Sequence, residues 1–217
     1  MAVFLITLPN HDDLTDYCSK WSTEILKTAQ ESLHQTKKLE GSEANRKNFE
    51  SKMTNFNPSF VVLNGHGNSK SVTGHANEAI LSCDESVKNE RLSKDKITYI
   101  RACGCGSELG NACITANCKS FIGYKEKFAL IKSKNMVSRP LDDERAKPFF
   151  EVSNQIPIAI LKGNTVEEAV EKADIKLEKE IQRLMTNDSF LASHIIPWLL
   201  WNKTIRVVLG NKKATIG

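Results

Sequence analysis

The chain has 217 residues, of which 26% are charged and 40% are hydrophobic, an ordinary composition for a globular protein. Its 30 basic and 26 acidic residues give a formal net charge of only +4, which argues against a nucleic-acid partner. No stretch approaches the roughly 18 apolar residues that span a bilayer, so we expect no membrane partner. We expect one domain over residues 1–217. We place it in the cytoplasm with reduced thiols, because its apolar start lacks the basic flank and cleavage site of a signal peptide.

The first part of the chain predicts two buried strands separated by helices. Val3–Leu8 is a continuous apolar run typical of a strand that is buried on both faces. Apolar residues then recur every three or four positions between Leu14 and Leu33, which is the spacing of a helix. A short strand at Thr36–Leu39 and a second helix precede the next buried strand, Phe60–Leu63.

Two strands run directly into glycine-rich turns that each carry a reactive side chain. Phe60–Leu63 leads into the turn Asn64-Gly65-His66-Gly67-Asn68. A loop and a helical piece follow, and then the strand Ile97–Ile100 leads into Arg101-Ala102-Cys103-Gly104-Cys105-Gly106. A short helix is predicted after this second turn, followed by a fourth buried strand at Phe121–Tyr124.

The last part of the chain predicts a long loop, two helices and a closing strand. Lys125–Lys147 is charged and irregular, as in an exposed loop, and Phe149–Leu161 is apolar and helical. Thr165-Val166-Glu167-Glu168 is a capping box that opens a long helix. Ile205–Leu209 is the final strand. Strands that alternate with helices predict an α/β fold with a mainly parallel sheet that is covered on both faces.

His66 and Cys103 are the candidate catalytic residues. In open α/β sheets the binding crevice lies beyond the carboxyl ends of the strands, so neighbouring parallel strands would bring both side chains to one edge. A free cysteine titrates near about 8.5 and is mostly protonated at neutral pH. A nearby imidazole can take the proton and later return it to a leaving amine. The helix after Gly106 would turn its positive end toward Cys103 and favour the thiolate.

The glycines of both turns suggest an oxyanion hole. Gly67 and Gly104 have no side chains, so the backbone at these turns can approach a ligand closely. We predict that the backbone donors of Gly67 and Cys103 face the gap between His66 and Cys103. Losing one such donor typically costs roughly 10²–10³ in rate.

These residues resemble the cysteine peptidases of the caspase, legumain, separase and gingipain group, clan CD. That group has a hydrophobic strand ending in His-Gly and a later one ending in Ala-Cys, commonly with a glycine three residues past the cysteine. Phe60–Gly67 and Ile97–Gly106 match the two blocks. The resemblance is closest to gingipain-like and CHAT-type bacterial members. It implies the caspase-hemoglobinase-like fold, a three-layer α/β/α sandwich with a mainly parallel central sheet.

The resemblance covers the chain from about Phe60 to its end. Four more stretches look like those of the family: Phe121–Tyr124, Arg139–Asp143 leading to Phe149-Phe150, Gly163–Ala169 and Asn202–Gly210. It implies a cysteine endopeptidase that cuts a protein or peptide substrate and needs no cofactor or metal, while an activating protein partner stays open. Cys103 is favoured over Cys105 as the nucleophile because it directly follows Ala102. The caspase signature after the cysteine is missing, so caspase specificity does not transfer.

The specificity pocket is predicted from acidic residues near the same sheet edge. Asp12 and Asp13 lie on the loop after the first strand, and Asp142 and Asp143 follow the strand that ends at Tyr124. In relatives these regions border the pocket for the residue before the scissile bond, and Tyr124 is counted with the four aspartates as a substrate-binding candidate. A buried carboxylate attracts Arg bidentately and Lys as a point charge, so we expect cleavage after Arg or Lys, including self-cleavage within 132–147. The equal alternative is that these aspartates cap helices.

Three other interpretations stay open. In the first, the chain is a catalytically silent scaffold or signalling domain of the same fold. In the second, Cys103 and Cys105 form a redox switch. A metal site would use the four clustered thiols Cys103, Cys105, Cys113 and Cys118. The spacing of these cysteines does not match zinc ribbons, which place two to four residues between paired ligands.

Histidines and tryptophans elsewhere are given structural roles. His11 lacks a reactive neighbour in sequence, and His75 is expected to be solvated in a polar loop. Trp198 and Trp201 lie in an apolar segment and are expected in the core.

Overall fold

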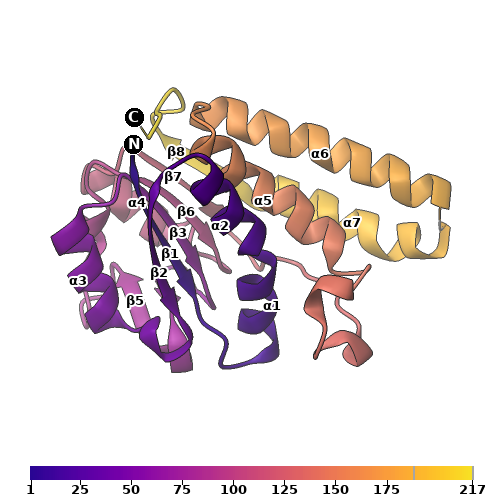
Figure 1. Ribbon diagram of the computed structural model, residues 1–217, viewed down its shortest axis with the longest axis horizontal. Coiled ribbons are helices and arrows are strands. Elements are labelled where there is room, and N and C mark those ends of the chain that lie inside the picture. Colours follow the sequence, from indigo (N-terminus) through magenta and orange to yellow (C-terminus); the bar gives the residue numbers. More distant parts are fainter. Residues whose placement is uncertain (188, 217) are drawn as a thin grey trace.

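The computed structural model describes residues 1–187 and 189–216, and its main sheet has six strands (Figure 1). The strands are β1 (Val3–Leu8), β2 (Gln35–Glu40), β3 (Phe60–Asn64), β6 (Ile97–Arg101), β7 (Ser120–Tyr124) and β8 (Arg206–Gly210). Their order is β2-β1-β3-β6-β7-β8. Every pairing from β2 to β7 is parallel, and β8 runs antiparallel to β7. The predicted mainly parallel sheet is confirmed.

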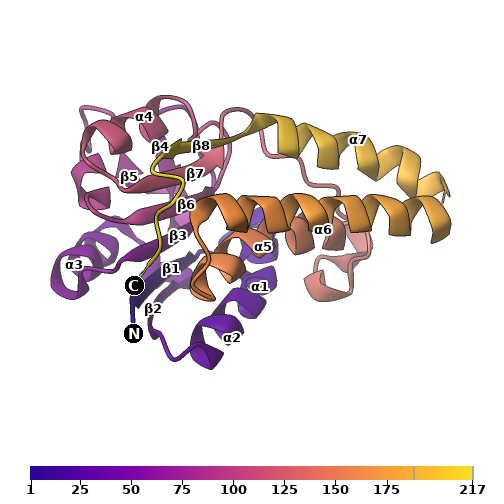
Figure 2. The same ribbon diagram turned by 90° about the horizontal axis from the view of Figure 1, so that it is seen from above.

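Helices cover both faces of this sheet (Figures 1 and 2). On one face lie α1 (Asp13–Trp21), α2 (Thr23–Glu31) and α5 (Lys147–Leu161), and on the other lie α3 (Arg46–Phe56) and α4 (Glu108–Thr115). Alternate side chains of a strand enter the two cores: Phe60 and Val62 pack in the cluster of α2 and α5, whereas Val61 and Leu63 pack in that of α3 and α4. The result is the predicted three-layer α/β/α sandwich.

Two long helices, α6 (Val166–Asn187) and α7 (Ser189–Ile205), lie side by side and extend beyond the sheet (Figures 1 and 2). The predicted capping box opens α6, since the backbone nitrogen of Thr165 donates to Glu168 at 2.8 Å. α7 was not predicted as a helix. The expectation that Trp198 and Trp201 lie in the core is wrong, because they are 46% and 39% exposed. In the described residues no helix is long and apolar enough to cross a membrane.

A short hairpin and a helix break are the other departures from the sequence prediction. The strands β4 (Ser71–Thr73) and β5 (Ala79–Ser82) pair antiparallel where a loop and a helical piece were expected. The single helix expected from Leu14 to Leu33 is divided between α1 and α2 at Ser22. The hydroxyl of this buried serine donates to Cys18 O and accepts from the Asn64 amide.

The described residues also form five short 3-10 helices: η1 (Gly41–Glu43), η2 (His75–Asn77), η3 (Glu90–Ser93), η4 (Lys134–Met136) and η5 (Pro140–Asp142). The last two lie in the segment 125–147, whose described residues form no longer helix and no strand before α5 begins at Lys147. This agrees with the irregular loop that its charged sequence predicts.

Candidate active site

His66 and Cys103 emerge from the same edge of the sheet. β3 and β6 are parallel neighbours, and their last residues, Asn64 and Arg101, are partners in the register. His66 and Cys103 each follow two residues later, so both begin from equivalent positions on adjacent strands. The carboxyl ends of parallel strands are where such sheets bind ligands.

The two turns touch through their backbones at Gly67. A Cβ atom added to Gly67 would lie 2.6 Å from Sγ of Cys105 and 2.7 Å from the carbonyl oxygen of Cys103. Such distances are far below van der Waals contact, so only glycine fits here. This close approach fixes the spacing between the turn of His66 and the turn of Cys103.

The hairpin supports the first turn and leaves the amide of Gly67 out of its pairing. Gly67 and Val72 form an isolated antiparallel bridge. The hydrogen bonds on either side run from Asn68 N to Ser71 O and from Thr73 N to His66 O, at 3.0 and 2.9 Å. The N–H of Gly67 takes no part in them, which suits the predicted oxyanion role.

Gly104 differs from Gly67 because its own amide is already engaged in a backbone hydrogen bond. Its φ is +73°, a conformation that favours glycine. Its amide donates to the carbonyl oxygen of Glu126 at 3.0 Å. The glycine at 104 therefore shapes the turn after Cys103, while its own donor is engaged by the segment that follows β7.

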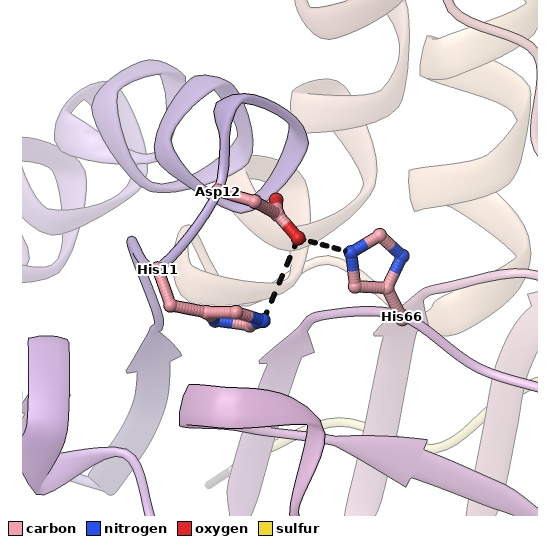
Figure 3. A group of neighbouring side chains, drawn as sticks. All are labelled: His11, Asp12 and His66. Carbon is pink, nitrogen blue, oxygen red and sulfur yellow. Dashed lines mark hydrogen bonds and ion pairs between the residues drawn. The ribbon is translucent and has the colours of Figure 1, made fainter.

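Asp12 holds the imidazole of His66 (Figure 3). Its Oδ2 atom lies 2.6 Å from Nε2 of His66, while its Oδ1 atom accepts from the backbone nitrogen of Thr15 at 2.9 Å and caps α1. Burial alone would raise the pKa of Asp12, but the hydrogen bonds from Thr15 and His66 outweigh it and lower the pKa to about 2. The ionised carboxylate favours the tautomer of His66 with its proton on Nε2, which leaves the lone pair of Nδ1 to accept another proton.

His11 is a neighbour that sequence reasoning missed. Its Nε2 atom lies 3.5 Å from the same Oδ2 atom of Asp12 and 3.3 Å from Oδ1 of Asn77. The rings of His11 and His75 meet edge to face with centroids 5.4 Å apart. His75 therefore has an aromatic neighbour and is half-buried, contrary to the solvated role expected for it. The available signal was that His11 and Asp12 follow the end of β1, at the edge that carries His66.

Two of the six cysteines, Cys83 and Cys103, are half-buried, and the other four are buried. Cys103 is half-buried, whereas Cys105 is buried with its Sγ 3.2 Å from Ser71 O. Burial, followed by the influence of Cys103, raises the pKa of the Cys105 thiol, so it stays protonated. Cys113 and Cys118 are buried in the α3–α4 core. The four-thiol metal site is wrong, because no three of these sulfurs converge in the described part of the chain.

Cys103 opens onto a surface cleft of about 480 Å³. The cleft is lined by the two turns, including Gly67 and Ser69, and by the segment 125–127 that follows β7. The predicted substrate residue Tyr124 lies elsewhere. It is 2% exposed, its hydroxyl lies 3.3 Å from that of Tyr99, and it lines a separate cavity of about 20 Å³.

Each predicted acidic pocket residue is engaged by other groups. Asp13 pairs with Lys132 at 2.8 Å, and Asp142 lies 4.0 Å from Arg139 on the surface. Asp143 is buried and accepts hydrogen bonds from three donors: Tyr17 Oη, Ser133 N and Arg145 N. Among the described residues, Glu126 is the one carboxylate that lines the cleft at Cys103.

No family model and no curated protein matches the sequence. Among solved structures, the chain is similar to the crystal structure of the Arg-specific cysteine proteinase gingipain R, with a TM-score of 0.59 and 10% sequence identity. The match covers 99% of this chain and 47% of that one, so the chain spans about half the length of this neighbour. At this identity the likeness shows the fold: the predicted caspase-hemoglobinase-like arrangement is confirmed, whereas the resemblance to CHAT-type members stays a prediction.

Proposed function

We propose that the chain, as one gingipain-like peptidase domain over residues 1–217, is a cysteine endopeptidase. Cys103 is its nucleophile and His66 its general acid and base. The observation that carries the proposal is that these two side chains follow register partners on adjacent strands, with His66 oriented by the ionised Asp12. The cytoplasmic location and an activating protein partner stay predictions of the sequence.

The first half of the reaction forms an acyl-enzyme. Nδ1 of His66 takes the proton of the Cys103 thiol, and the thiolate sulfur attacks the carbonyl carbon of the scissile bond. The amides of Gly67 and Cys103 stabilise the negative charge that develops on the carbonyl oxygen. The tetrahedral intermediate then collapses as the imidazolium of His66 gives its proton to the leaving amine, which leaves a thioester on Cys103.

The second half of the reaction releases the acyl group. A water molecule enters the position that the amine has left and gives a proton to His66 as its oxygen attacks the thioester carbon. The same amides stabilise the second tetrahedral intermediate. When the thiolate of Cys103 leaves, the carboxylic acid product is free and His66 returns the proton to the sulfur. Asp12 stabilises the imidazolium in both halves without giving up its own charge.

The proposal includes cleavage after Arg or Lys. It assigns the acidic residue of the pocket to Glu126 in place of the four predicted aspartates. The four aspartates predicted for the pocket are engaged by His66, Lys132, Arg139 and the donors around Asp143. Glu126 lines the cleft between Lys125 and Lys127, and its carboxylate is the acidic group assigned here to attract a basic side chain. Self-cleavage within 132–147 remains a corollary, and Arg139 is 67% exposed at its side chain.

The test is hydrolysis of fluorogenic peptides that vary in the residue before the scissile bond. The proposal expects turnover by the wild type, strongest with Arg or Lys, and loss of at least about 10³-fold in Cys103→Ala and His66→Ala. Cys105→Ala is the matched control and should keep most of the activity, because its thiol is buried. Full activity in Cys103→Ala, or none in the wild type with any peptide, would contradict it. A preference for Asp before the scissile bond would refute only the proposed cleavage after Arg or Lys.

A further inference from the structure

The carboxylate of Asp12 lies between two imidazole rings that come from different turns (Figure 3). The Nε2 atoms of His66 and His11 lie 2.6 and 3.5 Å from the same oxygen, Oδ2 of Asp12. These three side chains have their ligand atoms within 4.8 Å of one another, and the part of the chain that the structure describes holds no other such group of His, Cys, Asp or Glu. We propose that His11, Asp12 and His66 form a binding site for a divalent transition-metal ion, with Zn²⁺ as the best match.

The donor set selects the class of metal. Two imidazole nitrogens and one carboxylate oxygen suit Zn²⁺ and its neighbours, whereas Mg²⁺ and Ca²⁺ prefer oxygen ligands alone. Bonds of about 2.0–2.2 Å in a tetrahedral site put neighbouring ligand atoms about 3.4 Å apart. The 3.5 Å between His11 Nε2 and Asp12 Oδ2 already matches this separation. The shorter distance at His66 is that of a hydrogen bond, and it lengthens when zinc replaces the proton.

The site is held in place before any metal arrives. Asp12 is fixed by its bonds to Thr15 at the start of α1. His11 is placed by the ring of His75, and its Nε2 atom exchanges its bond to Asn77 for the ion when zinc binds. The side chains of His11, Asp12 and His66 are 13%, 38% and 37% exposed, so an ion can reach them from solvent. A water molecule takes the fourth position of a tetrahedral ion.

Metal binding at this site would switch the peptidase off, a consequence that rests on the proposed function. Zinc needs the lone pair of Nε2 on His66, so the ring must carry its proton on Nδ1 instead. In that tautomer Nδ1 cannot accept the proton of the Cys103 thiol. The metal also binds the carboxylate of Asp12, whose charge then no longer stabilises the imidazolium of His66. It therefore disables His66 and Asp12 without binding the sulfur of Cys103.

The binding test uses Zn²⁺ alone, measured by calorimetry and by competition with a chromophoric chelator. Cys103→Ala should bind one zinc ion with the affinity of the wild type, because the thiol is not a ligand. His11→Gln keeps a polar side chain beside Asn77 but loses the imidazole, and should weaken binding about tenfold or more. His194→Ala removes an exposed histidine on α7 and is the control, with unchanged affinity. Thermal unfolding checks that each variant is folded.

Cobalt separates this site from a metal bound to the catalytic thiol. Co²⁺ in the proposed site should give visible absorption without the near-ultraviolet charge-transfer band of a thiolate ligand. Zinc binding that is lost in Cys103→Ala but kept in His11→Gln would overturn the proposal, as would a wild type that binds no zinc. In the activity assay, His11→Gln should need about tenfold more zinc for half-inhibition, relative to its own uninhibited rate. If neither the wild type nor His11→Gln cuts peptides, the proposed function fails while the zinc-binding result stands.

Discussion

Nε2 of His66 lies 2.6 Å from Oδ2 of Asp12, and the same aspartate caps α1 through its other oxygen. One side chain therefore begins a helix and orients the candidate base. Replacing Asp12 by Asn separates these roles, because Asn is an equally good N-cap but carries no charge. Asp12→Asn should lower kcat about 10²-fold with little change in KM or thermal stability.

Asp12→Ala is the matched variant for the capping role. It loses the charge and the cap together, so it should share the kcat defect and also lose about 1 kcal/mol of stability. Steady-state kinetics and urea unfolding on both variants make the comparison. Wild-type kcat in Asp12→Asn would show that the carboxylate does not position His66.

The lowered pKa of Asp12 makes a prediction about acid. A carboxyl group with a folded pKa of about 2 and an unfolded pKa near 3.8 stabilises the fold above the unfolded value, and this is lost as pH falls through about 2. Since its side chain is 38% exposed, solvent screening reduces the contribution to about 1 kcal/mol. NMR titration of the carboxyl group should give the low midpoint, and a higher one in His66→Ala. A midpoint near 3.8 in the wild type would contradict the bond to His66.

Gly67 is predicted to tolerate no side chain. An added methyl group would press on Sγ of Cys105 and the carbonyl of Cys103, so the two turns would have to separate. Gly67→Ala should lose about 10²-fold in kcat/KM and about 1–3 kcal/mol in stability. Gly163→Ala is the control, with a φ of +84° but nothing within 4 Å of the new Cβ. It should cost about 1 kcal/mol of strain and leave the kinetics unchanged. Equal kinetics in both variants would argue against close contact of the turns.

Asp143 is predicted to be structural. Its carboxylate binds Tyr17 on α1 and the backbone of Ser133, so it ties the segment 125–147 to the first helix. Asp143→Ala leaves these buried donors unsatisfied and should cost about 3 kcal/mol. It should also make the segment more sensitive to a test protease. The neighbouring Asp142 is 64% exposed, and its alanine variant should stay within about 0.5 kcal/mol of the wild type. Equal stability of the two variants would contradict this role.

Most of the sheet could be predicted because its strands are continuous apolar runs. β1, β3, β6 and β7 lie within one residue of the predicted ranges, since burial on both faces leaves an unmistakable pattern. β4 and β5 were missed because three or four residues carry no readable period. α7 was missed because its residues are apolar on several sides, which blurs the helical period.

The candidate pair at the site could be predicted, whereas its surroundings could not. The pair follows strand ends, which local sequence marks with His-Gly and Ala-Cys. The partnership of Asp12 with His66 requires β1 to lie beside β3, and that order is a property of the folded sheet. Arg101 is a second example of contacts that local sequence does not reveal. Its buried guanidinium donates to Asn154 and lies 5.3 Å from the ring of Phe150. Both residues are on α5, about fifty residues away in the sequence.

The central claim is that Cys103 is a nucleophile activated beside His66, and covalent labelling tests it most directly. The protein is incubated with peptide acyloxymethyl ketones bearing Arg, Lys, Asp or Leu next to the reactive group, and the adduct is located by mass spectrometry. We predict one adduct on Cys103, fastest with Arg or Lys, and a labelling rate at least about 10²-fold lower in His66→Ala. Labelling of Cys105 or Cys83 in place of Cys103, or an equal rate in His66→Ala, would contradict the account.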